Sequence, residues 1–261
     1  MQRLPGVRAL ITGGSSGLGR AVAIRFATEG ARVVVTGRRA DALDETLAAV
    51  RAAGSEGAAV VADHARADDC ERAVREAVAF LGGLDVLVNA AGIIGFEGVL
   101  ESDAEKFRAM LETNLFGLYE VSRHAAPHLV AAAAERGDAS VLNVSSVAGL
   151  RPYAGLLGYC VSKAGVDMLT QSMALELAPK KVRVNAVNPG VVVTNLHLRT
   201  GMSAEAYQAF LERSATTHPI GRAGTADEVA ALVAFLSSDQ ARWITGALHS
   251  IDGGRAITSL R

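Results

Sequence analysis

Short apolar segments alternate with longer segments of helical hydrophobic spacing along this chain of 261 residues. The alternation predicts an α/β protein with a parallel sheet and helices on both faces. No internal repeat, low-complexity tract or linker interrupts it, so we expect a single domain over residues 1–261. The expected strands are 7–11, 32–36, 58–62, 85–88, 140–144, 182–187 and 247–251, and the expected helices are 18–30, 41–53, 68–81, 102–136, 156–177 and 227–236.

A glycine-rich turn, residues 12–19, joins the first expected strand to the first expected helix. Glycines at 13, 17 and 19 permit a tight turn and let the backbone approach a pyrophosphate. Free N–H groups at the start of the helix can then face phosphate oxygens. The turn therefore favours a dinucleotide phosphate site, and an ordinary glycine loop is the alternative.

Two arginines, Arg38 and Arg39, follow the second expected strand, about twenty residues past the glycine turn, where a dinucleotide fold binds the adenosine ribose. An acidic residue there would bind the 2′-hydroxyl of NAD(H), whereas a guanidinium suits the 2′-phosphate of NADP(H). We therefore favour NADP(H) over NAD(H), although both arginines could be solvated.

Asp63, after the third strand, can accept a hydrogen bond from the adenine amino group or cap the next helix.

Tyr159 and Lys163 lie one turn apart on the same face if residues 156–177 form a helix. An ammonium near a phenol favours the phenolate and lowers the phenol pKa from about 10 toward working pH. Such a tyrosine could donate a proton to a carbonyl oxygen or accept one from an alcohol. A surface Tyr/Lys pair is the alternative, since this spacing also occurs by chance.

Three further polar sites stand out beside this pair. Ser146 ends the fifth expected strand, where ligands bind in such sheets, but serines there are also common turn residues. Asn114 lies in an apolar stretch and must be hydrogen-bonded, as a structural plug or as part of a polar relay. His124 and His128 are four residues apart without an apparent third ligand, so we expect no metal.

Composition and charge exclude several classes of function. The formal net charge is −1, so no basic surface for nucleic acid is expected. No apolar run approaches the about 18 residues of a membrane span, and the N-terminal residues do not resemble a secretory signal. Two distant cysteines, Cys70 and Cys160, suggest neither a disulfide framework nor a metal motif. A cytoplasmic protein is the expectation.

Several short motifs occur in order along the whole chain. They are Thr12-Gly13-x-x-x-Gly17-x-Gly19, Asn89-Ala90-Ala91-Gly92, Asn114, Ser146, Tyr159-x-x-x-Lys163, Asn188-Pro189-Gly190 with Thr194, and Asp252-Gly253-Gly254. Taken together, the motifs resemble the short-chain dehydrogenase/reductase family over essentially the whole chain, with 3-oxoacyl-(acyl-carrier-protein) reductase-like members as the most similar group. Ala90 stands where asparagine is common in that family, which also tolerates alanine.

This resemblance implies a seven-stranded Rossmann sheet and hydride transfer. Tyr159 would be the general acid/base, Lys163 would lower its pKa and bind the nicotinamide ribose, and Ser146 would polarise the substrate oxygen. Asn114 would hold a water that links Lys163 to solvent. Asn89 would lie beside the adenosine ribose. The implied cofactor-binding residues are Gly13, Ser15, Ser16, Gly17, Leu18, Gly19, Arg38, Arg39, Asp63, Asn89, Ala91, Gly92, Tyr159, Lys163, Pro189, Gly190, Val192 and Thr194.

Residues 195–218 are expected to form a substrate lid, with Tyr153, Leu156 and Leu157 on the other side of the pocket. The lid carries enough apolar surface for a hydrophobic carbonyl or alcohol substrate. Arg199 and Arg213 could contact the phosphopantetheine of an acyl thioester substrate, or be solvated. The apolar lid residues are Leu196, Leu198, Met202, Tyr207, Phe210 and Leu211.

Two other functions remain open, an NAD-dependent alcohol, steroid or sugar dehydrogenase and a non-catalytic nucleotide sensor. The resemblance also implies a homo-tetramer or dimer that pairs the helices at 102–136 and 156–177. Small side chains on the first of these would allow close approach, although alanine is also simply a good helix former. They are Ala125, Ala126 and the alanines at 131–134.

Overall fold

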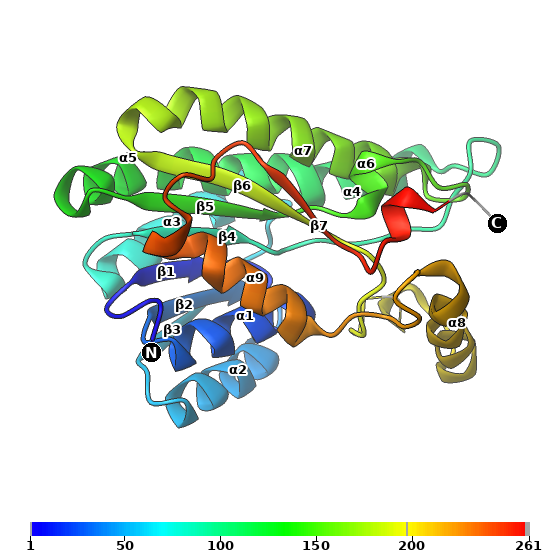
Figure 1. Cartoon of the computed structure of the whole chain (residues 1–261), viewed down its shortest axis with the longest axis horizontal. Coiled ribbons are helices and arrows are strands. Elements are labelled where there is room, and N and C mark those ends of the chain that lie inside the picture. The colour runs from blue at the N-terminus through cyan, green and yellow to red at the C-terminus, as the bar shows by residue number, and fades with distance from the viewer. Residues whose placement is uncertain (1, 197, 259–261) are drawn as a thin grey trace.

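The computed structural model describes residues 2–196 and 198–258, which contain a seven-stranded sheet in the order β3-β2-β1-β4-β5-β6-β7 (Figure 1). Each neighbouring pair is parallel. The expected α/β class and the seven-stranded Rossmann sheet are confirmed. The strands are β1 (Arg8–Ile11), β2 (Arg32–Gly37), β3 (Gly57–Val61), β4 (Val86–Asn89), β5 (Ala139–Val144), β6 (Val182–Pro189) and β7 (Leu248–Ile251).

Strands β5 and β6 are buried at every position, so their apolar residues lie in the core and their polar side chains are buried with them. They pair from Ala139 opposite Val182 to Val144 opposite Val187. β6 continues two residues past the end expected at 187. Asn188 and Pro189 therefore belong to the ladder, at the edge where the site forms.

Helices cover both faces of this sheet. The longer ones are α1 (Gly17–Thr28), α2 (Ala40–Ala52), α3 (Ala67–Leu81), α4 (Ala104–Leu111), α5 (Gly117–Arg136), α7 (Leu157–Leu177), α8 (Ala204–Thr217) and α9 (Ala226–Ser237). The short ones are α6 (Val147–Leu150), the π-helical turn η1 (Glu112–Phe116) and the 3-10 turns η2 (Ala178–Lys180), η3 (Leu198–Thr200), η4 (Asp239–Ala241) and η5 (Arg255–Ile257). No described helix is both long and apolar enough to cross a membrane.

The helices form two layers. α1, α2 and α9 pack on one face of the sheet, and α3, α5 and α7 pack on the other (Figure 1). Phe26 of α1 and Leu129 of α5 are fully buried in the respective cores. α2 buries Leu43, Leu47 and Val50, the three positions that its spacing predicts for the inner side.

Only some of the alanines in the alanine-rich stretch of α5 are open to a partner. Ala125 and Ala133 are packed in the core of their own chain, and Ala132 is also buried. Ala131 and Ala134 are exposed. A helix turns about 100° per residue, so four consecutive alanines cannot share a face.

The carboxyl ends of the strands form the edge that matters for function. β1 lies between β2 and β4, so the strand order reverses beside the end of β1. Ligands of open α/β sheets bind in the crevice at such a switch point. α8 lies apart from both helical layers, on the side of this edge (Figure 1).

Candidate active site

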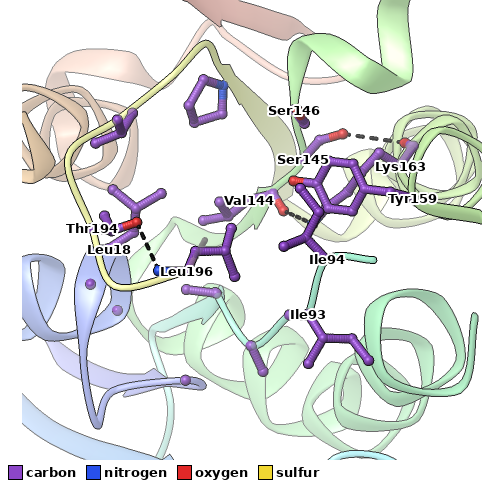
Figure 2. Close-up of a pocket in the computed structure, with 18 of the residues that line it drawn as sticks. Leu18, Ile93, Ile94, Val144, Ser145, Ser146, Tyr159, Lys163, Thr194 and Leu196 are labelled. Carbon is purple, nitrogen blue, oxygen red and sulfur yellow. Dashed lines mark hydrogen bonds between the residues drawn. The ribbon is translucent and has the colours of Figure 1, made fainter. Parts of the chain in front are cut away.

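A cavity of about 300 Å³ lies over the carboxyl ends of the strands. Figure 2 shows Ser146, Tyr159 and Lys163 on one side of it and Leu18, Thr194 and Leu196 on the other. Its lining includes most of the residues expected from the sequence. They are Gly13, Ser15, Ser16, Gly17, Leu18, Gly19, Arg38, Asp63, Ala91, Gly92, Ser146, Tyr159, Lys163, Pro189, Gly190, Val192 and Thr194.

The glycine turn leaves no room for side chains where it meets β4. Gly13 has φ +69°, and a Cβ there would lie 2.7 Å from the Ala90 carbonyl oxygen. A Cβ on Gly19 would collide with the Gly13 carbonyl. Thr12 Oγ1 accepts from the N–H groups of Ala90 (3.0 Å) and Ala91 (3.1 Å), so it joins the ends of β1 and β4. The result is a backbone-lined cradle at the start of α1.

The two arginines after β2 differ in position. Arg38 is exposed and lines the cavity, whereas Arg39 is exposed outside the lining and immediately precedes α2.

Asp63 also lines the cavity, and its carboxylate accepts from the N–H of Ala65 at 3.1 Å. Asp63 does not cap α3, because that helix begins after Arg66.

Asn89, which is expected beside the adenosine ribose, lies outside this lining. Its side chain is buried, and Nδ2 donates to Ser122 Oγ (3.0 Å) and Asn143 Oδ1 (2.9 Å). Asn143 Nδ2 in turn donates to Thr170 Oγ1 at 2.9 Å. The Asn89 side chain therefore joins β4, β5, α5 and α7, because its polar partners lie inside the protein.

Asn114 is fully buried in the π-helical turn η1, which interrupts the long helix expected at 102–136. Its Nδ2 donates to the Ile93 carbonyl (2.9 Å) and to Ser162 Oγ (3.0 Å), and its Oδ1 accepts from the Ile93 N–H (2.8 Å). π-helical turns are frequent at functional sites. A Cβ on Gly92 would lie 3.3 Å from Asn114 Oδ1 and 3.7 Å from Lys163 Nζ, so both polar groups border the same glycine.

Ser146, Tyr159 and Lys163 are buried side chains from two elements. Ser146 follows β5 and caps α6, with its Oγ accepting from the Ala148 N–H at 3.1 Å. Tyr159 and Lys163 come from α7, and the Lys163 Nζ lies 5.8 Å from the centre of the Tyr159 ring. That Nζ also donates to the Val144 carbonyl at 2.8 Å (Figure 2). The predicted i, i+4 arrangement is present.

The electrostatic effect on Tyr159 differs from the sequence prediction. Burial raises the pKa of Tyr159 to about 12, and the neighbouring Ser146 hydroxyl opposes the shift without reversing it. Burial also lowers the pKa of Lys163 to about 8, against the attraction of Asp167. Burial removes hydration from the charged form of each group, and this loss is the largest cause of both shifts. At neutral pH the phenol is therefore protonated and can donate.

Asp167 is a site residue that the sequence reading missed. It follows Lys163 by four residues on α7, the same spacing that links Tyr159 to Lys163. Asn188 Nδ2 donates to both Asp167 carboxylate oxygens at 3.0 Å and to the Ser146 carbonyl at 2.9 Å. Burial raises the pKa of Asp167. The carboxylate thus connects the ends of β5 and β6 with α7, and the repeated i, i+4 spacing was the available signal.

The remaining wall of the cavity is mostly apolar. It includes Ile93, Ile94, Phe96, Tyr153, Leu156, Leu196 and Phe210. Leu157, expected there, is exposed and outside the lining. Tyr207 of α8 donates to the Thr194 carbonyl (2.8 Å) and accepts from its N–H (3.1 Å), which fixes α8 to the loop after β6.

His64 lines the cavity next to Asp63, and we expect it to make the free energy of unfolding depend on pH. Its Nε2 is 2.8 Å from Thr36 Oγ1, and burial lowers its pKa to about 4. The unfolded chain, with a His pKa near 6.5, binds more protons between pH 4 and 6.5, so stability falls as pH falls through this range. We expect a loss of about 2 kcal/mol from pH 8 to pH 5.

Urea unfolding at pH 8 and pH 5 measures this loss. The His64→Gln variant lacks the titrating group, so its free energy of unfolding should fall by about 2 kcal/mol less than that of the wild type over the same interval. Equal losses in both proteins would contradict the assignment.

A family model and several named dehydrogenases and reductases match almost the whole chain. A family model described as enoyl-(acyl carrier protein) reductase matches residues 13–256. The 2,5-dichloro-2,5-cyclohexadiene-1,4-diol dehydrogenase of Sphingobium indicum is 36% identical over 255 residues, covering 98% of this chain and 98% of that protein. A 3-oxoacyl-(acyl-carrier-protein) reductase of Thermotoga maritima is 34% identical over 255 residues, covering 98% and 100%.

Among solved structures, carveol dehydrogenase from Mycobacterium avium in complex with NAD has a TM-score of 0.92 at 26% identity, covering 99% of this chain and 100% of that chain. The chain has a Rossmann sheet with a glycine cradle at its switch point, and its relatives are named dehydrogenases and reductases. These findings define the protein as an NAD(P)-dependent oxidoreductase. The chain belongs to the short-chain dehydrogenase/reductase family.

Proposed function

We propose that this protein interconverts a ketone and a secondary alcohol with NADP(H), using Tyr159 as general acid/base. The observation that carries the proposal is the placement of Ser146, Tyr159 and Lys163 in one cavity with the glycine cradle. In the reducing direction, Tyr159 Oη–H donates its proton to the carbonyl oxygen while the carbonyl carbon accepts a hydride. Ser146 Oγ–H donates to the same oxygen and stabilises the charge that develops there.

Lys163 and Asn114 support this proton transfer in the proposal. In the oxidising direction, the Lys163 ammonium stabilises the phenolate that accepts the alcohol proton, and it would bind the nicotinamide ribose. Asn114 holds a water that links Lys163 to solvent, which fits the shared border of both groups at Gly92. Its hydrogen bonds to Ile93 and Ser162 fix the amide in place.

The cradle residues fit a dinucleotide. NAD(P)(H) supplies the hydride when bound, and the space that a Cβ on Gly13 or Gly19 would need is already filled by backbone. The backbone can therefore approach a pyrophosphate closely at the start of α1. Pro189, Gly190, Val192 and Thr194 also line the cavity, and Val192 and Thr194 would lie beside the nicotinamide carboxamide.

Arg38 is the basis for favouring NADP(H). It lines the cavity at the end of β2, where a 2′-phosphate would lie, and no acidic residue ends that strand. NAD(H) remains the alternative, since the related carveol dehydrogenase was solved with NAD. Asp63 would accept from the adenine amino group.

Residues 195–218 act, in this proposal, as a substrate lid within a single domain over residues 1–261. Leu196 and Phe210 supply its apolar contacts to the cavity. The Tyr207 bonds to Thr194 tie movement of α8 to the cofactor side of the site. His197 lies outside the described residues.

A hydrophobic ketone or alcohol is the substrate class that suits this wall, as in the named alicyclic diol dehydrogenase. A 3-oxoacyl thioester is the second candidate, in line with the Thermotoga reductase. Arg213 is exposed on α8 outside the cavity lining, which favours solvation over contact with a thioester. The side chain of Arg199 lies outside the described part of the chain.

Assembly into a dimer or tetramer is supported by α7. Val161, Met168 and Leu175 repeat every seven residues and are 45%, 63% and 81% exposed, so they form an apolar stripe on one face.

We expect light scattering at micromolar concentration to give two or four times 27.0 kDa. Met168→Glu should reduce this mass, and Val99→Glu, on an equally exposed site off the stripe, should not. A wild-type mass near that of one chain would contradict the proposal.

NADPH absorbance during a substrate screen tests the function. The panel contains alicyclic ketones, diketones, acetoacetyl thioesters, steroids and sugars. Steady NADPH oxidation with any carbonyl compound supports the proposal. A non-catalytic nucleotide sensor of the same fold would bind the dinucleotide tightly and oxidise none with the whole panel.

A further inference from the structure

Arg255 places a positive charge at the apolar end of the cavity. It follows β7 in the turn η5 and lines the cavity together with Tyr153 and Leu156. Its guanidinium lies over the Tyr153 ring, 5.4 Å from the ring centre, and Arg151 also lies 5.4 Å from that centre. One phenol ring is therefore in contact with two guanidinium groups.

Within residues 2–196 and 198–258, no acidic side chain pairs with either of these two positive charges. The Asp252 carboxylate accepts instead from the N–H groups of Gly254 (3.0 Å) and Ala256 (2.6 Å). An anion that entered this end of the cavity would meet uncompensated positive charge.

The two arginines have different tasks. Arg151 Nη1 donates to the carbonyls of Arg255 (3.2 Å), Ala256 (3.1 Å) and Thr258 (2.6 Å), so it anchors the turn η5. Arg255 donates to the Thr217 carbonyl at 3.1 Å through Nη1, one of its five N–H donors. Arg255 thus keeps donors for a ligand, while Arg151 and the Tyr153 ring hold it in place.

Tyr153 supplies a second polar group. Its hydroxyl is buried and has no hydrogen-bond partner among the described residues. A buried polar group without a partner costs about 1–3 kcal/mol, so a ligand acceptor there would be favourable. Tyr153 packs against the cluster that contains Tyr159, Met110 and Ala148, which places it close to the proposed proton donor.

We propose that Arg255 and Tyr153 form a subsite for a carboxylate, so that the substrate is an apolar oxo acid or hydroxy acid. This deepens the proposed function and rests on it. The planar guanidinium fork suits a carboxylate, and the adjoining Ile93, Ile94 and Phe210 suit an apolar body. The carboxylate binds at Arg255 while the oxo group faces Ser146 and Tyr159.

Matched ketones test the subsite. We expect 4-oxocyclohexanecarboxylate to have a kcat/KM about tenfold above that of cyclohexanone, mainly through a lower KM. Arg255→Met should bring the kcat/KM for 4-oxocyclohexanecarboxylate down to that for cyclohexanone measured with the same variant. Tyr153→Phe keeps the ring under Arg255 and should lose part of the preference. Arg75→Met, an exposed arginine of α3 outside the cavity lining, is the control for charge alone and should behave as wild type.

A binding measurement separates failure of the subsite from failure of the proposed function. Calorimetric titration with cyclohexanecarboxylate, which has no oxo group, should show binding to the wild type that Arg255→Met weakens about tenfold. Equal binding to both proteins, or an equal substrate preference in both, would overturn the subsite. Binding that depends on Arg255 without turnover of any ketone would support the subsite and contradict the proposed reaction.

Discussion

Tyr159→Phe is expected to lower kcat by about 10²–10⁴-fold and to leave the affinity for NADPH nearly unchanged. The substitution removes the Oη–H that would donate to the carbonyl oxygen and keeps the ring, which is buried against Met110 and Ala148. Steady-state rates with the best ketone of the screen, together with NADPH fluorescence titration, measure the two effects. The loss should appear in kcat because the proton is transferred in the transition state.

Tyr119→Phe is the matched control, since Tyr119 is 43% exposed on α5 and outside the cavity lining. It should retain the wild-type rate. If the Tyr159 variant keeps a near-normal kcat, Tyr159 is not the general acid and the proposed chemistry is wrong. An equal loss of NADPH affinity would instead indicate a binding role.

Arg38→Ala is expected to weaken NADPH binding on the order of 100-fold and NADH binding by less than about threefold. The guanidinium would contact the 2′-phosphate, which NADH lacks. Fluorescence titration with both dinucleotides measures the change in preference. The effect should shrink at high salt, because Arg38 is exposed and its charge is screened.

Arg39→Ala provides a control one residue away, equally exposed but outside the cavity lining. It should change both affinities little. A larger effect at Arg39 than at Arg38 would reverse the assignment between the two arginines. Equal losses for NADPH and NADH in the Arg38 variant would show that the arginine does not recognise the 2′-phosphate.

Residues close together in the chain were placed well from the sequence. The glycine turn at 12–19, the Tyr159–Lys163 pair and the inner side of α2 depend on φ values, on helical repeat and on local hydrophobic spacing. Each of these is set within a few residues, so a linear pattern reveals it. Element boundaries agree to within one or two residues, apart from the π-helical turn inside the helix expected at 102–136.

The contacts that were not predicted from the sequence join residues that are far apart in the chain. Asn89 is joined to Ser122 and Asn143, and Asp167 is joined to Asn188, across different strands and helices. The Tyr153–Arg255 contact spans 102 positions of the chain. A linear pattern does not show which of several buried polar groups will meet, because that depends on how the layers pack.

The sequence by itself determined the alternation of strands and helices, the glycine cradle, and the presence of a phenol and an amine one helical turn apart. These features follow from backbone sterics and from periodicity, which act locally. The tertiary structure decided the direction of the Tyr159 pKa shift, the hydrogen-bond partners of Asn89 and Asp167, and the contact between Arg255 and the Tyr153 ring. Desolvation and charge compensation depend on every neighbour in space, and those neighbours come together only when the chain folds.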